Sequence, residues 1–236
     1  MFQIKRAKII ENRQITFDLF VMKVAGSYDV REGQIFMLKA LDADMTLYRP
    51  LSIFDANEES VSFLYSVRGK GTAIFSRLRA GDEILLHGAY GNGFPKANGK
   101  LALVGGGIGM APLLLVAKRN PNAEVYIGVR DDLYNDEEIS AIQNLFSEVN
   151  MKLKVGGIIT DAVPFDNYDV IFTCGPEIMM EAVSKKHANT YVSMEKHMGC
   201  GVGACLSCSC KVDGKMKKVC QDGPVFLGRE VFECAK

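Results

Sequence analysis

The spacing of hydrophobic and polar residues changes along the chain. Up to about residue 97, short runs of β-branched and aromatic residues alternate with glycine-containing turns, as in Gln34–Lys39, Ser60–Val67 and Glu83–Leu86. Runs of this length and composition are typical of β-strands, and several at such close spacing predict a small barrel. The apolar stripe within Thr72–Arg79 has the spacing of a helix instead.

From residue 98 to about residue 193, short apolar runs alternate with longer amphipathic ones. The pattern predicts strands at Leu101–Val104, Glu124–Val129 and Val170–Thr173. It predicts helices at Ala111–Lys118, Asp136–Phe146 and Glu177–Lys186. Strands and helices that alternate in this way form a parallel, doubly wound α/β sheet with helices on both faces.

Residues 194–236 show neither of these two patterns and are rich in cysteine and glycine. The sequence therefore predicts three parts: a β-barrel domain over residues 1–97, a doubly wound α/β domain over residues 98–193, and a C-terminal cysteine-rich module over residues 194–236. Pro95–Gly99 holds the proline and glycine that linkers favour, and it is the predicted junction of the first two parts.

Composition and charge narrow the class of protein. Lys+Arg and Asp+Glu both number 28, so the net charge is zero and the basic surface that nucleic-acid binding requires is not expected. No apolar run approaches the roughly 18 residues of a membrane helix, and Met1–Arg6 does not begin a signal peptide. We therefore expect a cytoplasmic protein. Its seven cysteines would be reduced there, so their clustering predicts metal or cluster ligation rather than disulfides.

Four cysteines of the last part have the spacing of an iron–sulfur site. Cys200, Cys205 and Cys208 form C-x4-C-x2-C, and Cys220 follows after eleven further residues. This is the plant-type spacing for a [2Fe–2S] cluster, in which four thiolates converge on two irons. The glycines around the first cysteines let the backbone wrap closely and turn its N–H groups toward the sulfurs.

The cysteine pattern leaves an alternative open. Four cysteines also bind structural zinc, although zinc sites favour paired C-x2-C knuckles and one such pair is present. His197 could replace a ligand, as in Rieske centres, but four cysteines already suffice. We interpret Cys210 as a small buried residue and Cys234 as a free thiol.

A glycine-rich loop in the α/β part has features of a nucleotide site. Gly105, Gly107 and Gly109 stand in the sequence G-G-G-I-G between a predicted strand and a predicted helix. Glycine there lets a pyrophosphate approach the backbone, and the helix N-terminus favours its negative charge. The strict G-x-G-x-x-G fingerprint fails at Met110, so an ordinary strand-to-helix turn remains the alternative.

A second turn, Cys174-Gly175-Pro176, follows another strand at the same predicted edge of the sheet. Nucleotides bind outside the carboxyl ends of strands in such sheets, which makes Gly175 and Pro176 candidate nucleotide contacts and Cys174 the candidate catalytic residue. A plain turn in which proline opens a helix is the alternative.

Three short motifs of the barrel part suit a phosphate or a flavin. In Arg49-Pro50-Leu51-Ser52, the arginine could pair with a phosphate and the serine could hydrogen-bond a flavin ring or its ribityl chain. Leu64-Tyr65-Ser66 follows, and Gly71-Thr72 then stands in a glycine-rich turn that opens the predicted helix. Each motif alone is typical of a surface turn, but their order along the chain changes the interpretation.

The motifs in this order resemble the ferredoxin–NADP reductase superfamily: R-x-x-S at Arg49–Ser52, GGGIGMAP at Gly105–Pro112 and CGP at Cys174–Pro176. The cysteine segment and the Gly91–Phe94 turn narrow the likeness. Over essentially the whole chain, the sequence is similar to the electron-transfer subunits of NAD-linked dihydroorotate dehydrogenase. One departure is Leu51, where the superfamily often has an aromatic residue stacked on the flavin; Tyr48 or Tyr65 could serve instead.

This resemblance implies cofactors and a partner. The barrel would bind FAD through Arg49–Ser52, Leu64–Ser66 and Gly71–Thr72, the α/β domain would take NAD(H) as co-substrate, and the four cysteines would ligate a [2Fe–2S] cluster. The partner would be an FMN-containing catalytic subunit, two of each in the complex, that oxidises dihydroorotate in pyrimidine biosynthesis. Electrons would pass from that FMN through the cluster and FAD to NAD+, because a flavin exchanges one-electron steps for a hydride.

Two other classes of function use the same features. A related electron-transfer subunit of a bifurcating ferredoxin, sulfide or hydrogenase complex has the same modules, although the compact length and Asp222–Phe226 favour the first reading. A zinc-stabilised nucleotide-binding regulator would not be an enzyme. No segment remains to build an orotate pocket, so we expect that this chain alone does not oxidise dihydroorotate.

The residues after the second predicted strand bear on the choice of nucleotide. Carboxylates at Asp131 and Asp132 would accept hydrogen bonds from ribose hydroxyls and repel the 2′-phosphate of NADP. Arg130 could instead receive that phosphate. On the paired acids and the resemblance, we expect NAD.

Overall fold

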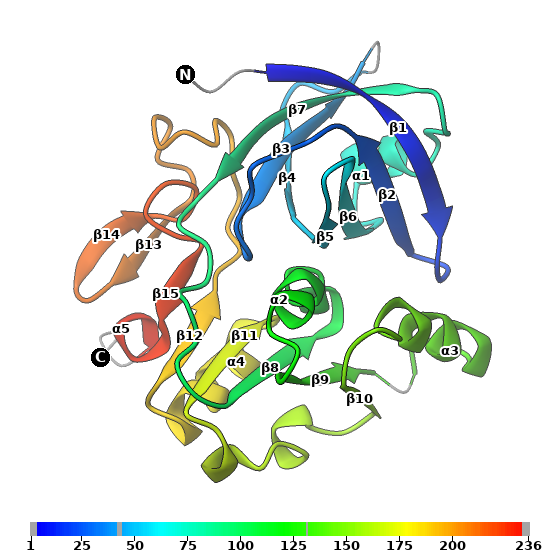
Figure 1. The fold of residues 1–236 in the computed structure, drawn as a ribbon. Coiled ribbons are helices and arrows are strands. Elements are labelled where there is room, and N and C mark those ends of the chain that lie inside the picture. Colours follow the sequence, from blue (N-terminus) through cyan, green and yellow to red (C-terminus); the bar gives the residue numbers. More distant parts are fainter. Residues whose placement is uncertain (1–3, 42–43, 131, 233–236) are drawn as a thin grey trace.

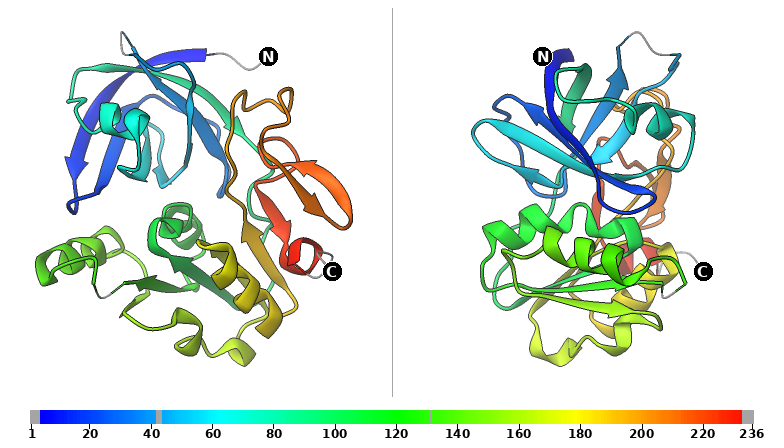
Figure 2. Two further views of the ribbon diagram at one scale, coloured as in Figure 1. Left: turned by 180° about the vertical axis from the view of Figure 1, so that it is seen from behind. Right: turned by 90° about the vertical axis from the view of Figure 1, so that its right-hand side faces the viewer.

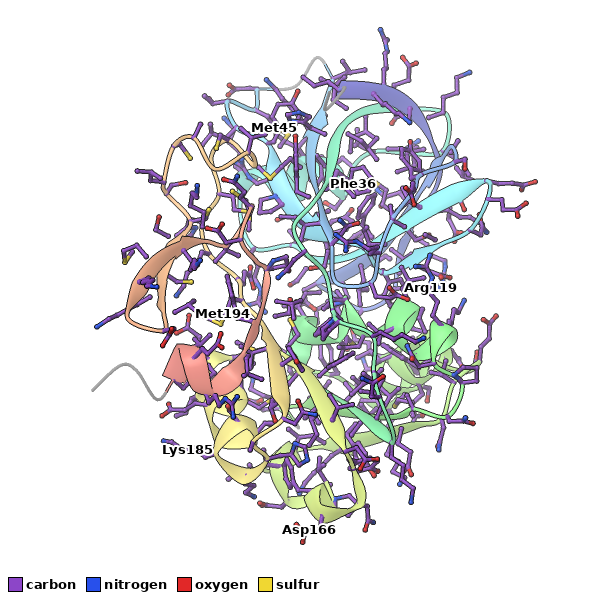
Figure 3. The ribbon with its side chains drawn as sticks, turned by 60° about the vertical axis from the view of Figure 1, so that its left-hand side comes forward. Phe36, Met45, Arg119, Asp166, Lys185 and Met194 are labelled. Carbon is purple, nitrogen blue, oxygen red and sulfur yellow. The ribbon has the colours of Figure 1, made fainter. Side chains whose placement is uncertain are left out.

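The computed structural model describes residues 4–41, 44–130 and 132–232, which form two packed sheets and a small hairpin beside them (Figure 1). The N-terminal part is a curled antiparallel sheet in the order β4-β3-β7-β1-β2-β6-β5. Its elements are β1 Ile4–Gln14, β2 Leu19–Ala25, β3 Ile35–Ala40, β4 Arg49–Ser52, β5 Asp55–Ala56, β6 Ser60–Ser66, α1 Lys70–Phe75 and β7 Glu83–Tyr90. The curl encloses an aromatic core that includes Phe63 and Phe36, the second of which is labelled in Figure 3.

The second sheet has the order β10-β9-β8-β11-β12-β15, and its strands are parallel from β10 to β12. Its elements are β8 Leu101–Gly106, α2 Leu113–Arg119, β9 Glu124–Val129, α3 Asp136–Leu145, β10 Met151–Val155, β11 Val170–Cys174, α4 Glu177–Lys186 and β12 Thr190–Ser193. Short 3-10 turns lie at Gly107–Met110, Ile159–Asp161 and Phe165–Asn167.

Helices cover both faces of this sheet. Along β8, Leu103 packs on the side of α2 and α3, whereas its neighbour Val104 packs on the side of α4. Because successive side chains of a strand point to opposite faces, a strand covered on both sides is apolar throughout. The short apolar runs of the sequence have this cause, and the predicted doubly wound arrangement is confirmed.

Helix α2 joins the two sheets into one body. Leu115 packs into the barrel core, and its N–H donates to the Phe54 carbonyl at 3.0 Å. At the end of the helix, the Arg119 guanidinium donates to the Val30 carbonyl at 3.1 Å and lies 3.4 Å from the Glu32 carboxylate. Figure 3 shows Arg119 at this junction. The edges of the two sheets are therefore held in a fixed relation.

The last segment leaves the second sheet and returns to it. It forms the hairpin β13 Ser209–Val212 and β14 Lys215–Lys218, then β15 Val225–Leu227 and α5 Gly228–Phe232. β15 pairs antiparallel with β12, so residues 194–224 are an excursion between two neighbouring strands (Figure 2). The predicted third module therefore shares its final strand with the α/β sheet.

The structure adds elements that the sequence pattern did not reveal. Strands β1, β2, β4, β10 and β12 were not predicted; β1 is largely polar, and β4 and β12 have only four residues each. The helix predicted at Thr72–Arg79 lies at Lys70–Phe75, because a tight turn with Gly81 at φ 95° follows it. In the described part of the chain, none of the helices has the length and apolar character needed to cross a membrane.

Candidate functional site

The two predicted nucleotide turns meet where the order of the parallel sheet reverses. The chain runs from β8 outward through β9 to β10, and then continues on the other side of β8 with β11. Gly105 at the end of β8 is paired with Cys174 at the end of β11. Ligands of doubly wound sheets bind at the carboxyl ends of the strands beside such a switch point. The sequence therefore placed these turns correctly at one edge.

Glycine is required for the close approach of these turns. A Cβ atom on Gly109 would stand 2.2 Å from the Cys174 carbonyl oxygen, and one on Gly175, with φ 148°, would stand 3.0 Å from the Gly106 main chain. Gly107 differs, since its φ is 54° but a Cβ would meet no atom within 4 Å. Its main chain thus borders open space that a phosphate group can enter, and Pro176, the residue before α4, lies against Gly106 of the same loop.

Cys174, the candidate catalytic residue, has a protonated thiol in this setting. The residue keeps some exposed surface, but its sulfur lies deep in the fold. Burial, assisted by the negative charge of Glu195 and opposed by a hydrogen bond with Ser193, raises the pKa of the Cys174 thiol to about 12. At neutral pH the residue therefore offers a small neutral group at the edge of the site, not a nucleophilic thiolate.

Two of the predicted flavin motifs are brought together at the barrel. Arg49 lies against Gly71, where a Cβ would stand 2.4 Å from the arginine Nε. Its guanidinium donates to the Leu47 carbonyl at 2.7 Å and keeps other N–H groups for a ligand. Pro50, Leu51 and Ser52 are partly exposed on β4. The Thr72 hydroxyl accepts from the Arg68 N–H at 2.9 Å and so closes the turn before α1.

The third motif is turned inward, which corrects one expectation. Leu64, Tyr65 and Ser66 of β6 are all buried. The Tyr65 ring packs near Phe20 and Phe75, and its hydroxyl donates to Asn12 at 3.0 Å. Tyr65 therefore cannot be the residue that stacks on a flavin, whereas Tyr48, next to Arg49, remains partly exposed. The Ser66 hydroxyl is bound to Asp18, so a ligand at this strand would meet its main chain.

The cysteine loop turns its main-chain N–H groups toward sulfur. The Cys200 sulfur accepts from the N–H groups of Val202, Ala204 and Cys205 at 3.3 to 3.4 Å. The Cys220 sulfur accepts from the Gly203 N–H at 3.2 Å. Such bonds stabilise thiolates and, in a ligated cluster, tune its reduction potential. The loop therefore fits a group held by negatively charged sulfurs.

The four thiols stand in two pairs. Cys208 and Cys220 are buried with their sulfurs 3.3 Å apart, and Cys205 forms a hydrogen bond with Cys200. Among the described residues, no three or more His, Cys, Asp or Glu side chains are grouped to hold a single metal ion. A binuclear cluster shares four thiolates between two irons, and two pairs match that need.

The thiols differ in acidity. A hydrogen bond with the Ser207 hydroxyl, assisted by the Ser207 N–H and by Cys200, lowers the pKa of the exposed Cys205 to about 6. Burial, assisted by Cys208, raises the pKa of Cys220 to about 12. Ser207 also accepts the Gly199 N–H at 3.1 Å. Sequence reasoning missed Ser207, and its position inside C-x2-C was the available signal.

The cysteine loop rests on the barrel beside the predicted flavin motif. A Cβ on Gly201 would stand 2.7 Å from the Met37 side chain and 3.2 Å from the Tyr90 ring. Met37, Tyr90 and Ile35 form a small apolar cluster against which Tyr48 and Met198 pack. Burial, with added charge from Cys200 and Cys220, raises the pKa of Tyr90 to about 12. This cluster therefore links the cysteine loop to Tyr48, the residue before β4.

Asn92 is a second residue that sequence reasoning did not single out. Its amide donates to the Val225 carbonyl at 2.8 Å and accepts from the Val225 N–H at 3.2 Å. The neighbouring Gly91 leaves no room for a Cβ, which would stand 2.4 Å from Pro224. The signal was the G-N-G turn, which ties the end of the barrel to the last segment and thereby fixes the cysteine loop.

The remaining candidates fall outside this arrangement. Cys210 is buried in the core around Met194 and Val219, as predicted for a small structural residue. The Arg130 Nε atom lies 3.5 Å from the Asp132 carboxylate in an exposed ion pair, so part of the positive charge of Arg130 is already neutralised. Asp131 and Cys234 lie outside the described residues.

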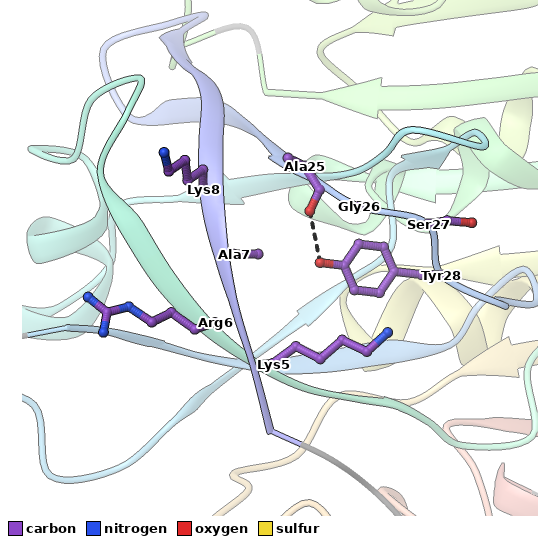
Figure 4. A pocket seen from close by; sticks show the side chains of 8 residues that line it. All are labelled: Lys5, Arg6, Ala7, Lys8, Ala25, Gly26, Ser27 and Tyr28. Atoms are coloured by element: carbon purple, nitrogen blue, oxygen red, sulfur yellow. Dashed lines mark hydrogen bonds between the residues drawn. The ribbon is translucent and has the colours of Figure 1, made fainter.

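A hollow of about 540 Å³ lies far from these motifs, on the outer side of the barrel (Figure 4). It is lined by Lys5, Arg6, Ala7, Lys8, Ala25, Gly26, Ser27 and Tyr28. Arg6 is already paired with Glu83, and Lys5 covers the Tyr28 ring at 5.0 Å. None of the residues in the predicted flavin, nucleotide or cysteine motifs lines this hollow, so it is a separate feature of the barrel surface.

Comparison with known proteins gives close relatives. Residues 195–232 match the family described as the iron-sulfur cluster binding domain of dihydroorotate dehydrogenase B. The electron transfer subunit of dihydroorotate dehydrogenase B (NAD(+)) from Clostridium acetobutylicum is 42% identical over 95% of this chain and 96% of its own length. The subunit of the same name from Clostridium perfringens is 40% identical over 96% of this chain and 97% of its own.

Solved structures show the same architecture. The structure of an NADH-dependent reduced ferredoxin-NADP oxidoreductase, described for flavin-based electron bifurcation, has a TM-score of 0.79 at 27% identity and covers 96% of this chain and 90% of its own. Phthalate dioxygenase reductase has a TM-score of 0.64 at 16% identity, over 80% of this chain and 67% of its own. The second likeness shows the fold alone.

Proposed function

The chain belongs to the family of electron transfer subunits of NAD(+)-dependent dihydroorotate dehydrogenase B, and from this membership we propose that it carries electrons from dihydroorotate oxidation to NAD+. Its cofactors are FAD and a [2Fe–2S] cluster, and NAD(H) is its co-substrate. The observation that carries the proposal is the cysteine loop, with paired thiols and main-chain N–H groups aimed at sulfur beside a flavin-type barrel.

Cys200, Cys205, Cys208 and Cys220 are the proposed cluster ligands. When bound, the cluster supplies one-electron transfer. The N–H groups of Val202, Ala204 and Gly203 stabilise the negative charge on the sulfurs. The exposed Cys205 and Leu206 leave one side of the loop open, and electron exchange with a partner needs such an approach.

The barrel face between β4 and α1 is the proposed FAD site. When bound there, FAD converts between the hydride of NAD(H) and single electrons. Arg49 offers a cation to a phosphate, Ser52 a hydroxyl, and Gly71 the space beside Arg49. Tyr48, partly exposed at the start of β4, takes the stacking role that Leu51 leaves open. Tyr48 and Met198 pack against the same small cluster around Met37, which brings this face close to the cluster loop.

The carboxyl edge of β8 and β11 is the proposed NAD(H) site. Gly107 leaves room for the pyrophosphate, and Gly109 and Gly175 allow the two turns to pack so closely that they form one continuous binding surface. The neutral Cys174 thiol occupies little space where the nicotinamide must approach the flavin. These residues bind and orient; none of them transfers a proton in this scheme.

The partner is an FMN-containing catalytic subunit, two of each in the complex, in the cytoplasm. Val202 and Leu206 expose 41% and 62% of their surface on the cluster loop. Exposed apolar side chains that lie together are typical of a surface that binds another protein. Burial of these side chains against the partner would bring its flavin close to the cluster.

A related electron-transfer role in a bifurcating complex is the second candidate. The oxidoreductase structure with a TM-score of 0.79 favours it, but its 27% identity is well below the 42% of the dihydroorotate dehydrogenase subunit. The family membership therefore decides for the first candidate.

Purification with and without the catalytic subunit tests the proposal. The isolated chain should carry flavin and iron–sulfur absorbance and reduce artificial acceptors with NADH, while the complex couples dihydroorotate to NAD+. Dihydroorotate oxidation by the pure isolated chain, with NAD+ as the only acceptor, would contradict it. So would a colourless chain that contains zinc.

A further inference from the structure

The turn between β1 and β2 reaches from the barrel across to the α/β domain. The Phe17 N–H donates to the Glu138 carboxylate at 2.6 Å, and the second oxygen of that carboxylate accepts from the Asn135 N–H at 3.1 Å. Asn135 in turn caps α3 by accepting from the Glu138 N–H at 2.9 Å. The start of α3 is thus held by its own capping box and by the main chain of the other domain.

Asp18 of the same turn makes a second connection. Its side chain is 8% exposed and accepts three hydroxyl hydrogen bonds: from Thr16 at 3.1 Å, from Ser66 at 2.6 Å and from Tyr134 at 3.2 Å. No ion pair with another described residue is formed. A buried carboxylate without a cation depends on its hydrogen-bond donors, so loss of one is costly and the geometry is fixed.

Tyr134 is the part of this cluster that belongs to the other domain. Its ring lies 5.8 Å from that of Phe17 between centroids, and burial together with the charge of Asp18 raises the pKa of its hydroxyl. Tyr134 lies in the connection that follows β9, close after Arg130 and Asp132. In doubly wound sheets, that position meets the ribose of a dinucleotide.

The cluster therefore joins two binding regions. Ser66 ends strand β6 of the barrel, which leads to Arg68 and the turn before α1. Tyr134 belongs to the α/β domain, where it lies between the end of β9 and the start of α3. We propose that Asp18 and Tyr134 are positioning residues for the adenosine half of NAD(H): they hold the connection after β9 at a fixed height above the barrel. The inference rests on the proposed NAD(H) site.

Simple domain packing is the competing explanation, and it predicts a different outcome. A contact that only holds the domains together lowers thermal stability and flavin retention when it is lost. A contact that positions the ribose side weakens nucleotide binding at unchanged flavin content and unchanged turnover rate, because the hydride transfer region at Cys174, at the end of β11, lies two strands away from β9 along the edge.

Tyr134→Phe removes the hydroxyl and keeps the ring. The probe is ADP-ribose, which lacks the nicotinamide and cannot be reduced, titrated calorimetrically into the flavin-loaded protein. We expect its Kd to rise about threefold to tenfold, the effect of losing one hydrogen bond of ordinary net strength. The KM for NADH with ferricyanide as acceptor should rise by the same factor, with kcat unchanged.

Two further variants complete the test. Tyr28→Phe is the matched control, since its hydroxyl donates to the Ala25 carbonyl at 3.0 Å within the barrel, and it should leave the Kd unchanged. Asp18→Asn should raise the Kd as Tyr134→Phe does. An unchanged Kd in folded Tyr134→Phe protein, or a change in proportion to lost flavin, would overturn the inference. Failure of the unaltered protein to bind ADP-ribose would instead refute the proposed NAD(H) site.

Discussion

The cysteine loop and the carboxyl edge of the parallel sheet build their sites in opposite ways. In the loop, side chains are the ligands, and the main chain assists them with N–H groups such as those of Ala204 and Gly203. At the sheet edge, the main chain forms the surface, and Gly109 and Gly175 contribute by having no side chain. Side-chain spacing defines the first site, whereas sheet topology defines the second.

This difference decides how each site tolerates change. A ligand thiol has no substitute in its loop, because the other cysteines already hold their own positions. The sheet edge is supported by neighbouring strands on both sides, so it keeps its shape and loses affinity by degrees. Four substitutions test the contrast.

Replacement of a ligand should have the largest effect. Cys208→Ser removes one of two buried paired sulfurs, so we expect complete loss of the cluster with most of the flavin retained. Iron, sulfide and flavin are measured per chain. Cys210→Ser, in the core outside the pairs, is the control and should keep the cluster. Equal iron loss in both variants would remove the distinction between ligand and core cysteine.

Filling the sheet edge should have a graded effect. In Gly109→Ala the added Cβ would stand 2.2 Å from a carbonyl oxygen, so the two turns must separate, at a cost of about 1–3 kcal/mol. NADH binding should weaken roughly tenfold or more, with the cluster spectrum unchanged. Gly69→Ala, where a Cβ meets no atom within 4 Å, serves as control. Normal NADH affinity in Gly109→Ala would place the nucleotide elsewhere.

Loss of the cation at the barrel face should weaken FAD binding about tenfold. Arg49→Ala removes a charge-assisted hydrogen bond at a partly exposed site, where the contribution lies at the low end of the usual range, about 1.5 kcal/mol. Flavin retention on gel filtration is the measurement, and added FAD should restore the spectrum. Arg13→Ala, which breaks an exposed ion pair with Glu11, is the control. Equal retention in both variants would remove Arg49 from the FAD site.

The smallest effect concerns acidity within the loop. In cluster-free protein, the pKa of Cys205 lies at about 6, below the usual value for a thiol, so its reactive thiolate predominates at pH 7 and is lost as the pH falls through 6. Cys220, with a pKa of about 12, stays protonated. Alkylation followed by mass spectrometry across pH 5–9 should therefore modify Cys205 first.

Ser207→Ala should move the alkylation midpoint of Cys205 upward, since the hydroxyl that stabilises the thiolate is gone. Ser209→Ala, whose hydroxyl bonds to the Leu206 carbonyl instead, is the matched control. A midpoint that does not differ between these two variants would show that the main chain alone sets the acidity of Cys205.

The same contrast explains what the sequence could predict. The cluster ligands could be predicted because C-x4-C-x2-C…C fixes the spacing of the side chains that bind. The strand at Glu124–Val129 could be predicted because both of its faces are covered, which makes it largely apolar. The Tyr65 ring was one of two candidates for stacking on a flavin and is buried instead, since a sequence does not tell which face of β6 points inward. The antiparallel return of β15 was also missed, because three residues carry too little periodicity to mark a strand.

Contacts between distant segments were the least predictable. Asp18 reads as a loop residue, and its buried position follows from hydroxyls that lie 48 and 116 residues further along the chain. Asn92 likewise gains its role from Val225. Such residues have no local pattern, since their partners are set by how the barrel and the sheet pack.

Because β12 pairs with β15, the cluster-bearing residues 194–224 form an insertion, or cassette, between two adjacent strands of one sheet. Its two ends, at Ser193 and Val225, are partners in one sheet, so the gap that the cassette bridges is only the spacing of adjacent strands. A reductase that connects the same two strands by a short turn would keep its sheet, because insertions between closely spaced ends are tolerated. In evolutionary terms, an iron–sulfur relay could enter or leave this fold in one step, without rebuilding the flavin and nucleotide sites on either side.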